Sequence, residues 1–233
     1  MNFSKKLVFI IVLEMLSAST HASCVILLHG LARTSSSMEK LEKSLSEEKY
    51  HVVNLGYPSR EDTIEVLAER AISSALAECS FEHEVNFVTH SLGGILVRQY
   101  LSQQEIPNLF RVVMLGPPNQ GSEVVDKMGN VPGFKFIVGK AGMQLGTEAS
   151  SVPQILGKAE FDLGIIAGNK SINLLFSYLV PGQDDGSVSV DNTKLKGMND
   201  HIVMPARHFF MMSNKNVIAQ TIHYLKNGKF KKE

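Results

Sequence analysis

The segment Thr89-His-Ser-Leu-Gly-Gly94 places a serine between an apolar run and a run with helical spacing. A serine at such a strand-to-helix turn has its hydroxyl raised above the sheet and lies at a helix N-terminus. Neighbouring backbone packs against this turn, so small residues are needed two positions to either side. Gly93 meets that need, and Thr89 stands where glycine is usual. The pattern predicts that Ser91 is a nucleophile.

A serine nucleophile needs a base to accept its proton and a buried carboxylate to hold that base in the right tautomer. Both groups occur late in the chain. Gly182-Gln-Asp-Asp-Gly186 supplies Asp184 and Asp185, and Pro205-Ala-Arg-His208 ends in His208. The order serine, acid, histidine is that of serine hydrolases with a nucleophile elbow. The spacing alone leaves both aspartates open as the acid.

Two late histidines compete for the role of base. His208 follows a short predicted strand, 201–204, whereas His201 stands at the start of that strand. Catalytic groups of parallel sheets gather at the carboxyl ends of the strands, which favours His208. His90 is next to Ser91 in sequence, but we expect its side chain to point elsewhere, because side chains alternate along a strand.

The first predicted strand ends in His29-Gly-Leu31. Acyl transfer needs amide donors aimed at the oxyanion that develops on the substrate. We expect the backbone amides of Leu31 and of Leu92, the residue after the serine, to supply an oxyanion hole. His29 is expected to support this loop through backbone contacts, because its place in the chain order does not suit the general base.

These segments lie on alternating apolar strands and amphipathic helices. The predicted strands are 24–29, 51–55, 85–90, 111–115, 163–167 and 201–204, and the predicted helices are 38–45, 62–76, 92–101 and 214–226. Such alternation predicts an α/β fold, a mainly parallel sheet with helices on both faces. Residues 119–160, rich in Gly and Pro, break the rhythm and predict a cap insertion within a single domain, 23–233.

The sequence resembles the α/β-hydrolase superfamily, and within it the small bacterial lipases and esterases with a GPI inositol-deacylase-like core. The resemblance runs from Cys24 to about Phe230 and rests on Leu27-Leu-His-Gly-Leu31, Val88-Thr-His-Ser-Leu-Gly-Gly94, Met114-Leu-Gly-Pro-Pro-Asn-Gln-Gly-Ser122, Gly182-Gln-Asp-Asp-Gly186 and Arg207-His-Phe-Phe-Met211. It implies that Ser91 is the nucleophile and His208 the base. It favours Asp185 as the acid, since the family motif keeps Asp-Gly. It implies no cofactor.

The N-terminus has the pattern of an export signal. Lys5 and Lys6 precede a short apolar run, and small residues follow it up to Ala22. This run is shorter than the ~20 residues that a membrane-spanning helix needs. We therefore expect residues 1–22 to be a cleaved signal peptide and the mature protein to be periplasmic or secreted. Cys24 follows at once, which leaves lipidation of that residue as an alternative.

The two cysteines of the chain, Cys24 and Cys79, lie just before the first and third predicted strands. In the strand order of the α/β-hydrolases these strands are neighbours, so the resemblance implies that the thiols meet. An exported chain with two cysteines favours a disulfide between them. In the chain-entropy model, closing this loop contributes about 4 kcal/mol.

Charge and composition exclude other classes of function. The chain of 233 residues has 23 Lys and Arg against 23 Asp and Glu, so its formal net charge is zero. This balance gives no electrostatic footprint for nucleic acid. No His or Cys group has the spacing of metal ligands, and we expect no metal site.

These observations together predict a carboxylic ester hydrolase that works through an acyl-enzyme. Apolar residues of the cap, among them Phe134 and Ile137, are expected to line a wall for an acyl chain and to make transient contact with a membrane surface. Two alternatives remain open. One is a serine acyltransferase or amidase with the same triad, and the other is a non-catalytic binding protein on this fold.

Overall fold

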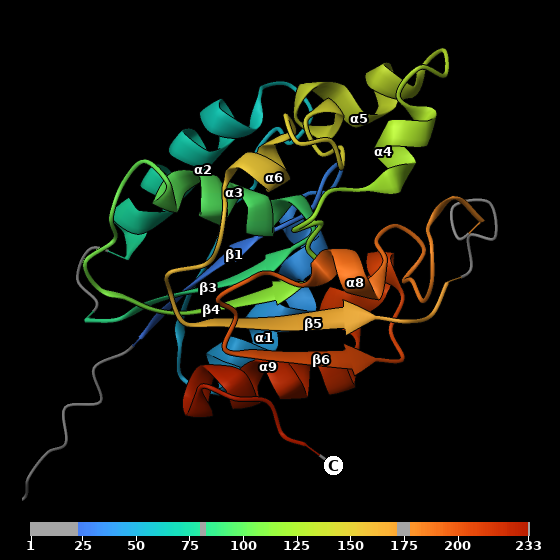
Figure 1. Ribbon diagram of the computed structural model, residues 1–233. Coiled ribbons are helices and arrows are strands. Elements are labelled where there is room, and N and C mark those ends of the chain that lie inside the picture. The colour runs from blue at the N-terminus through green and yellow to red at the C-terminus, as the bar shows by residue number, and fades with distance from the viewer. Residues whose placement is uncertain (1–22, 80–82, 172–177, 233) are drawn as a thin grey trace, which may run out of the picture.

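Figure 1 shows the computed structural model of the chain, which describes residues 23–79, 83–171 and 178–232. The predicted signal peptide, residues 1–22, lies outside the described residues. Strands and helices alternate along the chain. The elements are β1 (Cys24–Leu28), the 3-10 helix η1 (Ser35–Met38), α1 (Glu39–Glu47), β2 (His51–Asn54), α2 (Ile64–Glu78), β3 (Val85–His90), α3 (Leu92–Leu101), β4 (Leu109–Leu115), α4 (Glu123–Met128), α5 (Phe134–Met143), α6 (Val152–Ile155), β5 (Leu163–Gly168), α8 (Val190–Thr193), β6 (Asp200–Met204), the 3-10 helix η2 (His208–Ser213) and α9 (Lys215–Asn227).

The described strands form one sheet in the order β2-β1-β3-β4-β5-β6, and each neighbouring pair is parallel. Helices α2 and α3 cover one face, and α1 and α9 cover the other (Figure 1). Every residue of β1, β3 and β5 is buried, which explains their nearly unbroken apolar sequences. The predicted α/β fold is confirmed. Because the strands are parallel, their carboxyl ends share one edge, where the polar segments of the sequence meet.

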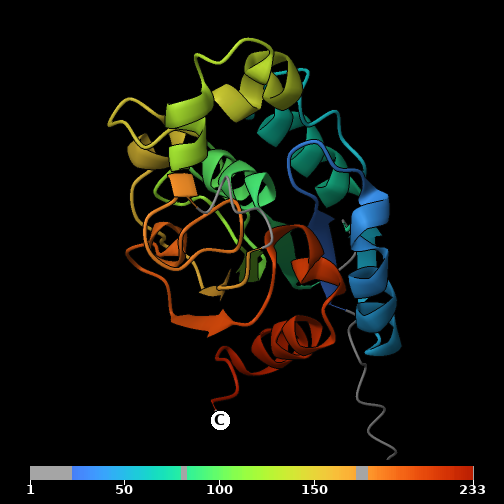
Figure 2. The same cartoon turned by 90° about the vertical axis from the view of Figure 1, so that its right-hand side faces the viewer.

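The segment between β4 and β5 carries the short helices α4, α5 and α6, although its sequence shows no clear period. Helix α4 has 6 residues and α6 has 4, too few to give a repeat. Helix α5 is kinked at Gly139, whose φ is 69°. Figure 2 shows α4 and α5 together at one end of the molecule, beyond the carboxyl ends of the strands. We call residues 119–160 the cap.

Cys24 and Cys79 form a disulfide with a Cα–Cα distance of 5.8 Å, which confirms the predicted pairing. Cys24 begins β1 and Cys79 caps the C-terminus of α2. The bond therefore ties a central strand to a helix at the edge of the sheet opposite the site. It also occupies the Cys24 sulfur that lipidation would require. Within the described residues, no helix has the length and apolar character needed to cross a membrane.

Candidate active site

Ser91 lies on a tight turn between β3 and α3. Its φ is 52° and its ψ is −118°, a backbone conformation that residues other than glycine rarely adopt. The turn is held by the Ser91 amide, which donates to the Leu115 carbonyl of β4 at 2.9 Å. A Cβ at Gly93 would lie 2.6 Å from the Leu28 carbonyl oxygen, so glycine is required there. Thr89, in place of the usual glycine, is fully buried in β3.

His208 joins Ser91 to Asp185. Its Nε2 lies 3.1 Å from the Ser91 hydroxyl, and its Nδ1 lies 2.7 Å from Asp185 Oδ2. Because a carboxylate only accepts, Nδ1 carries the proton in this pair and leaves Nε2 free to accept one from Ser91. The side chains of His208 and Asp185 are almost completely buried. These three residues, which the sequence predicted from separate segments, form one hydrogen-bonded chain.

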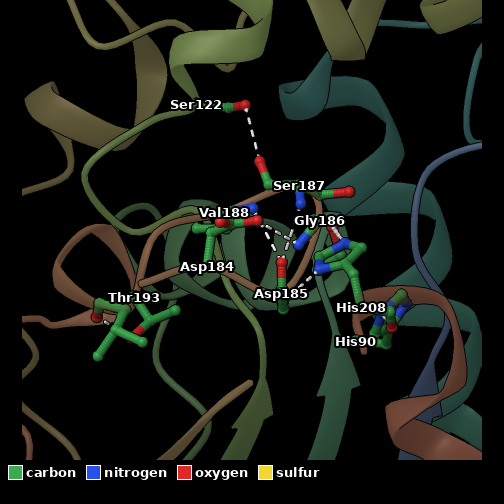
Figure 3. A network of polar contacts seen from close by, with 11 residues as sticks. His90, Ser122, Asp184, Asp185, Gly186, Ser187, Val188, Thr193 and His208 are labelled. Atoms are coloured by element: carbon green, nitrogen blue, oxygen red, sulfur yellow. Dashed lines mark hydrogen bonds and ion pairs between the residues drawn. The ribbon is translucent and has the colours of Figure 1, made fainter. Parts of the chain in front are cut away.

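The two aspartates of the late acidic loop have different partners (Figure 3). Asp185 Oδ1 accepts the amides of Ser187 and Val188 at 3.0 and 2.9 Å, which leaves Oδ2 for His208. Asp184 instead accepts the Gly186 amide at 2.7 Å and stabilises the turn. The geometry therefore separates two residues that the sequence left as alternatives.

Two glycines make room for the acid and the base, and sequence reasoning missed both. A Cβ on Gly116 would lie 2.9 Å from Asp185 Oδ2 and 3.1 Å from His208 Nδ1. One on Gly168 would lie 2.8 Å from Asp185 Cβ. Gly116, with a φ of 54°, directly follows β4, and Gly168 is the last residue of β5. Both glycines directly follow the apolar strands predicted from the sequence, 111–115 and 163–167, and this position is the signal that could have found them.

The side chain of His29 stabilises the loop that follows β1. His29 Nδ1 donates to the Gly30 carbonyl at 2.9 Å, and its Nε2 accepts the Tyr57 amide at 3.3 Å. The rings of His29 and Tyr57 stack with their centroids 4.0 Å apart. Burial lowers the pKa of His29, which favours the neutral imidazole that these two hydrogen bonds require. The supporting role predicted for His29 agrees with these contacts, and Tyr57 is an addition to it.

Leu31 lies in a turn closed by the Arg33 amide, which donates to the Gly30 carbonyl at 3.2 Å. Ala32 has a φ of 54° in this turn, and its amide donates to Ser59 Oγ at 3.0 Å. These bonds fix the backbone around Leu31 beside Ser91. Leu92 is the first residue of α3, where amides lack partners within the helix. Leu31 and Leu92 thus both lie in backbone segments that are held by hydrogen bonds within the protein.

The side chain of His90 lies beside the site, and the expectation that it points away is wrong. Its ring centroid is 4.8 Å from that of His208, and its Nε2 lies 2.9 Å from the His208 carbonyl oxygen. Alternation along a strand fails here because the chain leaves β3 at His90 to form the tight turn. His201, the competing base, lies on β6, and its Nε2 is 3.0 Å from Thr193 Oγ1 of α8. It is not part of the hydrogen-bonded chain of Ser91, His208 and Asp185.

A pocket of about 220 Å³ opens over Ser91 and His208. Its wall is mostly apolar and comes largely from the cap. The apolar cap side chains in it are Val124 and Val125 from α4, Phe134, Ile137 and Val138 from α5, and Leu145. Within the part of the chain that the structure describes, no group of His, Cys, Asp and Glu side chains could hold a metal ion. The site is therefore built from a serine, a histidine, a carboxylate and an apolar wall.

A model of the palmitoyl protein thioesterase family matches residues 24–156, more than half of the 233-residue chain. A comparison with curated proteins finds no match. Among solved structures, the mature form of the lipase BlEst2 from Bacillus licheniformis is similar, with a TM-score of 0.66. The sequences are 18% identical, over 90% of this chain and 93% of that chain.

Two longer proteins share the fold. Phospholipase PlaB from Legionella pneumophila gives a TM-score of 0.64 at 19% identity, over 89% of this chain and 57% of that chain. Lipase B from Aspergillus fumigatus gives 0.63 at 15% identity, over 88% of this chain and 53% of that chain. This chain thus spans little more than half of either. From its family match and its fold, the chain belongs to the palmitoyl protein thioesterase family and is an ester hydrolase with the α/β-hydrolase fold.

Proposed function

We propose that the protein cleaves esters and thioesters of apolar acyl chains, with Ser91 as nucleophile, His208 as general base and Asp185 as the acid. The observation that supports this most strongly is the hydrogen-bonded chain through His208, at 3.1 Å to Ser91 and 2.7 Å to Asp185. A general base must lie within about 2.6–3.2 Å of the group that it deprotonates, and His208 does. Membership in a thioesterase family speaks against the binding-protein alternative.

The reaction proceeds by two acyl transfers. The Ser91 oxygen attacks the substrate carbonyl carbon while His208 Nε2 takes the hydroxyl proton, and the amides of Leu31 and Leu92 stabilise the oxyanion. When the intermediate collapses, His208 gives this proton to the departing alcohol or thiol, and the acyl group stays on Ser91. Water, deprotonated by His208, then attacks the carbonyl carbon of the acyl-enzyme. When this second intermediate collapses, the carboxylic acid leaves and His208 returns the proton to the Ser91 oxygen. Asp185 holds the imidazole in the required tautomer throughout.

The apolar pocket supports an acyl chain as the group recognised. A volume of about 220 Å³ is smaller than the roughly 300–1,000 Å³ of sites for drug-sized ligands, which favours one unbranched chain. We expect p-nitrophenyl octanoate to be cleaved with a higher kcat/KM than either the acetate or the palmitate. The name of the family refers to thioesters, so hydrolysis of octanoyl thioesters of small thiols tests the second substrate class.

A fluorophosphonate probe tests the nucleophile directly. We expect the wild type to be labelled and Ser91→Ala to be unlabelled. Ser102→Ala, at the other end of α3, is the matched control and is expected to label like the wild type. A folded wild type that resists both this probe and a small sulfonyl fluoride would exclude an activated serine. Product analysis with added alcohols or amines separates hydrolysis from the acyltransferase and amidase alternatives.

We further propose that the protein works outside the cytoplasm, in the periplasm or the medium. The disulfide between Cys24 and Cys79 supports an oxidising compartment. The mass of the N-terminal peptide of protein recovered from the periplasm and the medium tests this proposal. We expect it to begin at Ser23, after removal of residues 1–22. An N-terminus at Met1 would contradict cleavage.

A further inference from the structure

His90 contacts the main chain of the proposed base. Its Nε2 lies 2.9 Å from the His208 carbonyl oxygen, and both groups are buried. Because a carbonyl only accepts hydrogen bonds, Nε2 is the protonated nitrogen and Nδ1 is the unprotonated one. The His208 amide, in turn, donates to the Asp185 carbonyl at 2.9 Å. The backbone of His208 is therefore held on both sides of its Cα, by Asp185 and by His90.

The opposite edge of the His90 ring lies against the loop that precedes Leu31. A Cβ built on Gly30 would lie 2.6 Å from His90 Nδ1 and 3.2 Å from Ser91 Cβ. The ring thus fills the space that the missing side chain of Gly30 leaves, and it touches the loop through one edge and His208 through the other. Within the described residues, Nδ1 is buried and has no hydrogen-bond partner. A buried polar atom without a partner reduces stability, so an apolar residue at this position would cost less for packing alone.

We infer that His90 is a positioning residue for the proposed ester hydrolysis, which fixes the main chain of His208 against the Gly30 loop so that Nε2 stays within reach of Ser91. The inference rests on the proposed function. It explains why a polar ring stays in a fully buried position. A positional error of about 1 Å between reacting groups can cost a hundredfold in rate, so one hydrogen bond to the backbone of the base has a measurable effect.

The neutral state of His90 suits this role. Burial lowers the pKa of His90 well below its usual range, and nearby His208, Arg33 and His29 each oppose a positive charge on it. His208 carries a positive charge during the reaction, and a second charge 4.8 Å away would work against it. A neutral N–H donor holds His208 without this penalty. The replacement that preserves the role is therefore an uncharged donor of similar reach.

The matched pair His90→Gln and His90→Leu isolates the donor. Glutamine can donate to the His208 carbonyl, whereas leucine fills a similar volume and cannot. We expect His90→Leu to lower kcat about tenfold or more, with KM within twofold of wild type. The loss falls on kcat because a loosened His208 takes the Ser91 proton less well, whereas the apolar pocket that binds the acyl chain is unchanged. We expect His90→Gln to stay within about threefold of wild type.

The control is His201→Leu, which removes a histidine of β6 outside the site and is expected to leave kcat and KM unchanged. Melting temperatures are measured for all variants, and His90→Met replaces His90→Leu if the latter does not fold. Equal losses in the leucine and glutamine variants, or a leucine variant with the wild-type kcat, would overturn the inference while leaving the proposed function intact. A wild type without esterase activity would overturn both.

Discussion

Asp184 and Asp185 are adjacent and both buried, yet they serve different partners. A left-handed glycine, Gly186 with a φ of 99°, follows them and turns the chain so that one carboxylate caps the turn and the other faces His208. The backbone conformation of this loop, rather than the residue type, therefore determines which of the two aspartates contacts His208. Neighbouring aspartates in one loop therefore make a sharp experimental comparison.

We predict that Asp185→Asn lowers kcat by about four orders of magnitude with KM little changed, because the amide can donate to His208 Nδ1 and stabilise the wrong tautomer. Asp184→Asn is expected to keep at least about a tenth of the wild-type kcat, since Asp185 makes the contact with His208 Nδ1 and Asp184 accepts the Gly186 amide of the turn. The measurement is steady-state hydrolysis of p-nitrophenyl octanoate by both variants. The opposite order of losses would assign the acid to Asp184.

We predict that acid destabilises the protein, because several of its histidines are buried. Burial lowers the pKa of His29, His90 and His201 from the ordinary value of 6.5, so the unfolded chain binds more protons than the folded one below that pH. Stability is therefore complete above about pH 6.5 and falls as the pH drops. Urea unfolding between about pH 8 and pH 5 should show this slope, and His90→Gln should flatten it. A slope that His90→Gln leaves unchanged would contradict the assignment to His90.

At the scale of elements, the cap is attached through Arg98 of α3. This guanidinium is only 4% exposed and donates to the carbonyls of Asn119, Pro153 and Gly157 at 3.0, 2.8 and 2.9 Å. The Asn119 carbonyl lies at the start of the cap. The Pro153 carbonyl lies in α6 and the Gly157 carbonyl just after α6, near the end of the cap. One side chain therefore fixes both ends of the segment that walls the pocket. Burial lowers its pKa to about 10, so it remains cationic at neutral pH.

We predict that Arg98→Lys destabilises the protein by about 1–3 kcal/mol, because an ammonium group cannot span all three carbonyls and leaves buried acceptors unpaired. It should also weaken the preference for the octanoyl over the acetyl ester, since the cap wall loosens. Urea unfolding and kcat/KM for the two esters measure these effects. Arg70→Lys, on the exposed face of α2, is the control and is expected to stay near wild type. A stable Arg98→Lys with unchanged chain preference would exclude this attachment.

The disulfide acts on stability rather than on catalysis. It closes a loop of 55 residues at the edge of the sheet opposite Ser91. We predict that Cys24→Ser with Cys79→Ser lowers the free energy of unfolding by about 4 kcal/mol while kcat stays within about twofold. Urea unfolding and steady-state kinetics on the double variant measure both. A large loss of kcat in a folded double variant would contradict the separation of the two edges.

The sequence predicted the strands and long helices well, because burial on both faces of a parallel sheet leaves apolar runs that length alone identifies. It also placed Ser91, the pair Asp184 and Asp185, and His208 in segments that follow strands, and the family resemblance favoured Asp185. It failed for the cap, whose helices are too short and too kinked to repeat. It failed for His90 and for Gly116 because their roles depend on contacts between segments far apart in the chain, which no local pattern records.

At the scale of the whole molecule, the cap presents large apolar side chains outward as well as inward. Phe136 is 88% exposed, Ile137 is 61% exposed and Val131 is 43% exposed. Lys135 and Lys140 lie on the same helix, α5, as Phe136 and Ile137. We expect this exposed apolar cluster with basic neighbours, next to the mouth of the apolar pocket, to make contact with a membrane surface. Such contact would let an acyl chain pass from a lipid surface into the pocket.

We predict that Phe136→Ser with Val131→Ser reduces cosedimentation with vesicles of mixed neutral and anionic lipid by about tenfold, because each exposed aromatic or aliphatic side chain that enters the interface contributes on the order of 1.5–3 kcal/mol. Activity on water-soluble p-nitrophenyl butyrate should change little, whereas activity on vesicle-borne esters should fall with binding. Phe110→Ser is the control, since Phe110 is 39% exposed at the start of β4, far from the cap. Equal vesicle binding by all three proteins would mean that the cap faces water, and that its substrates arrive as dissolved molecules rather than from a membrane.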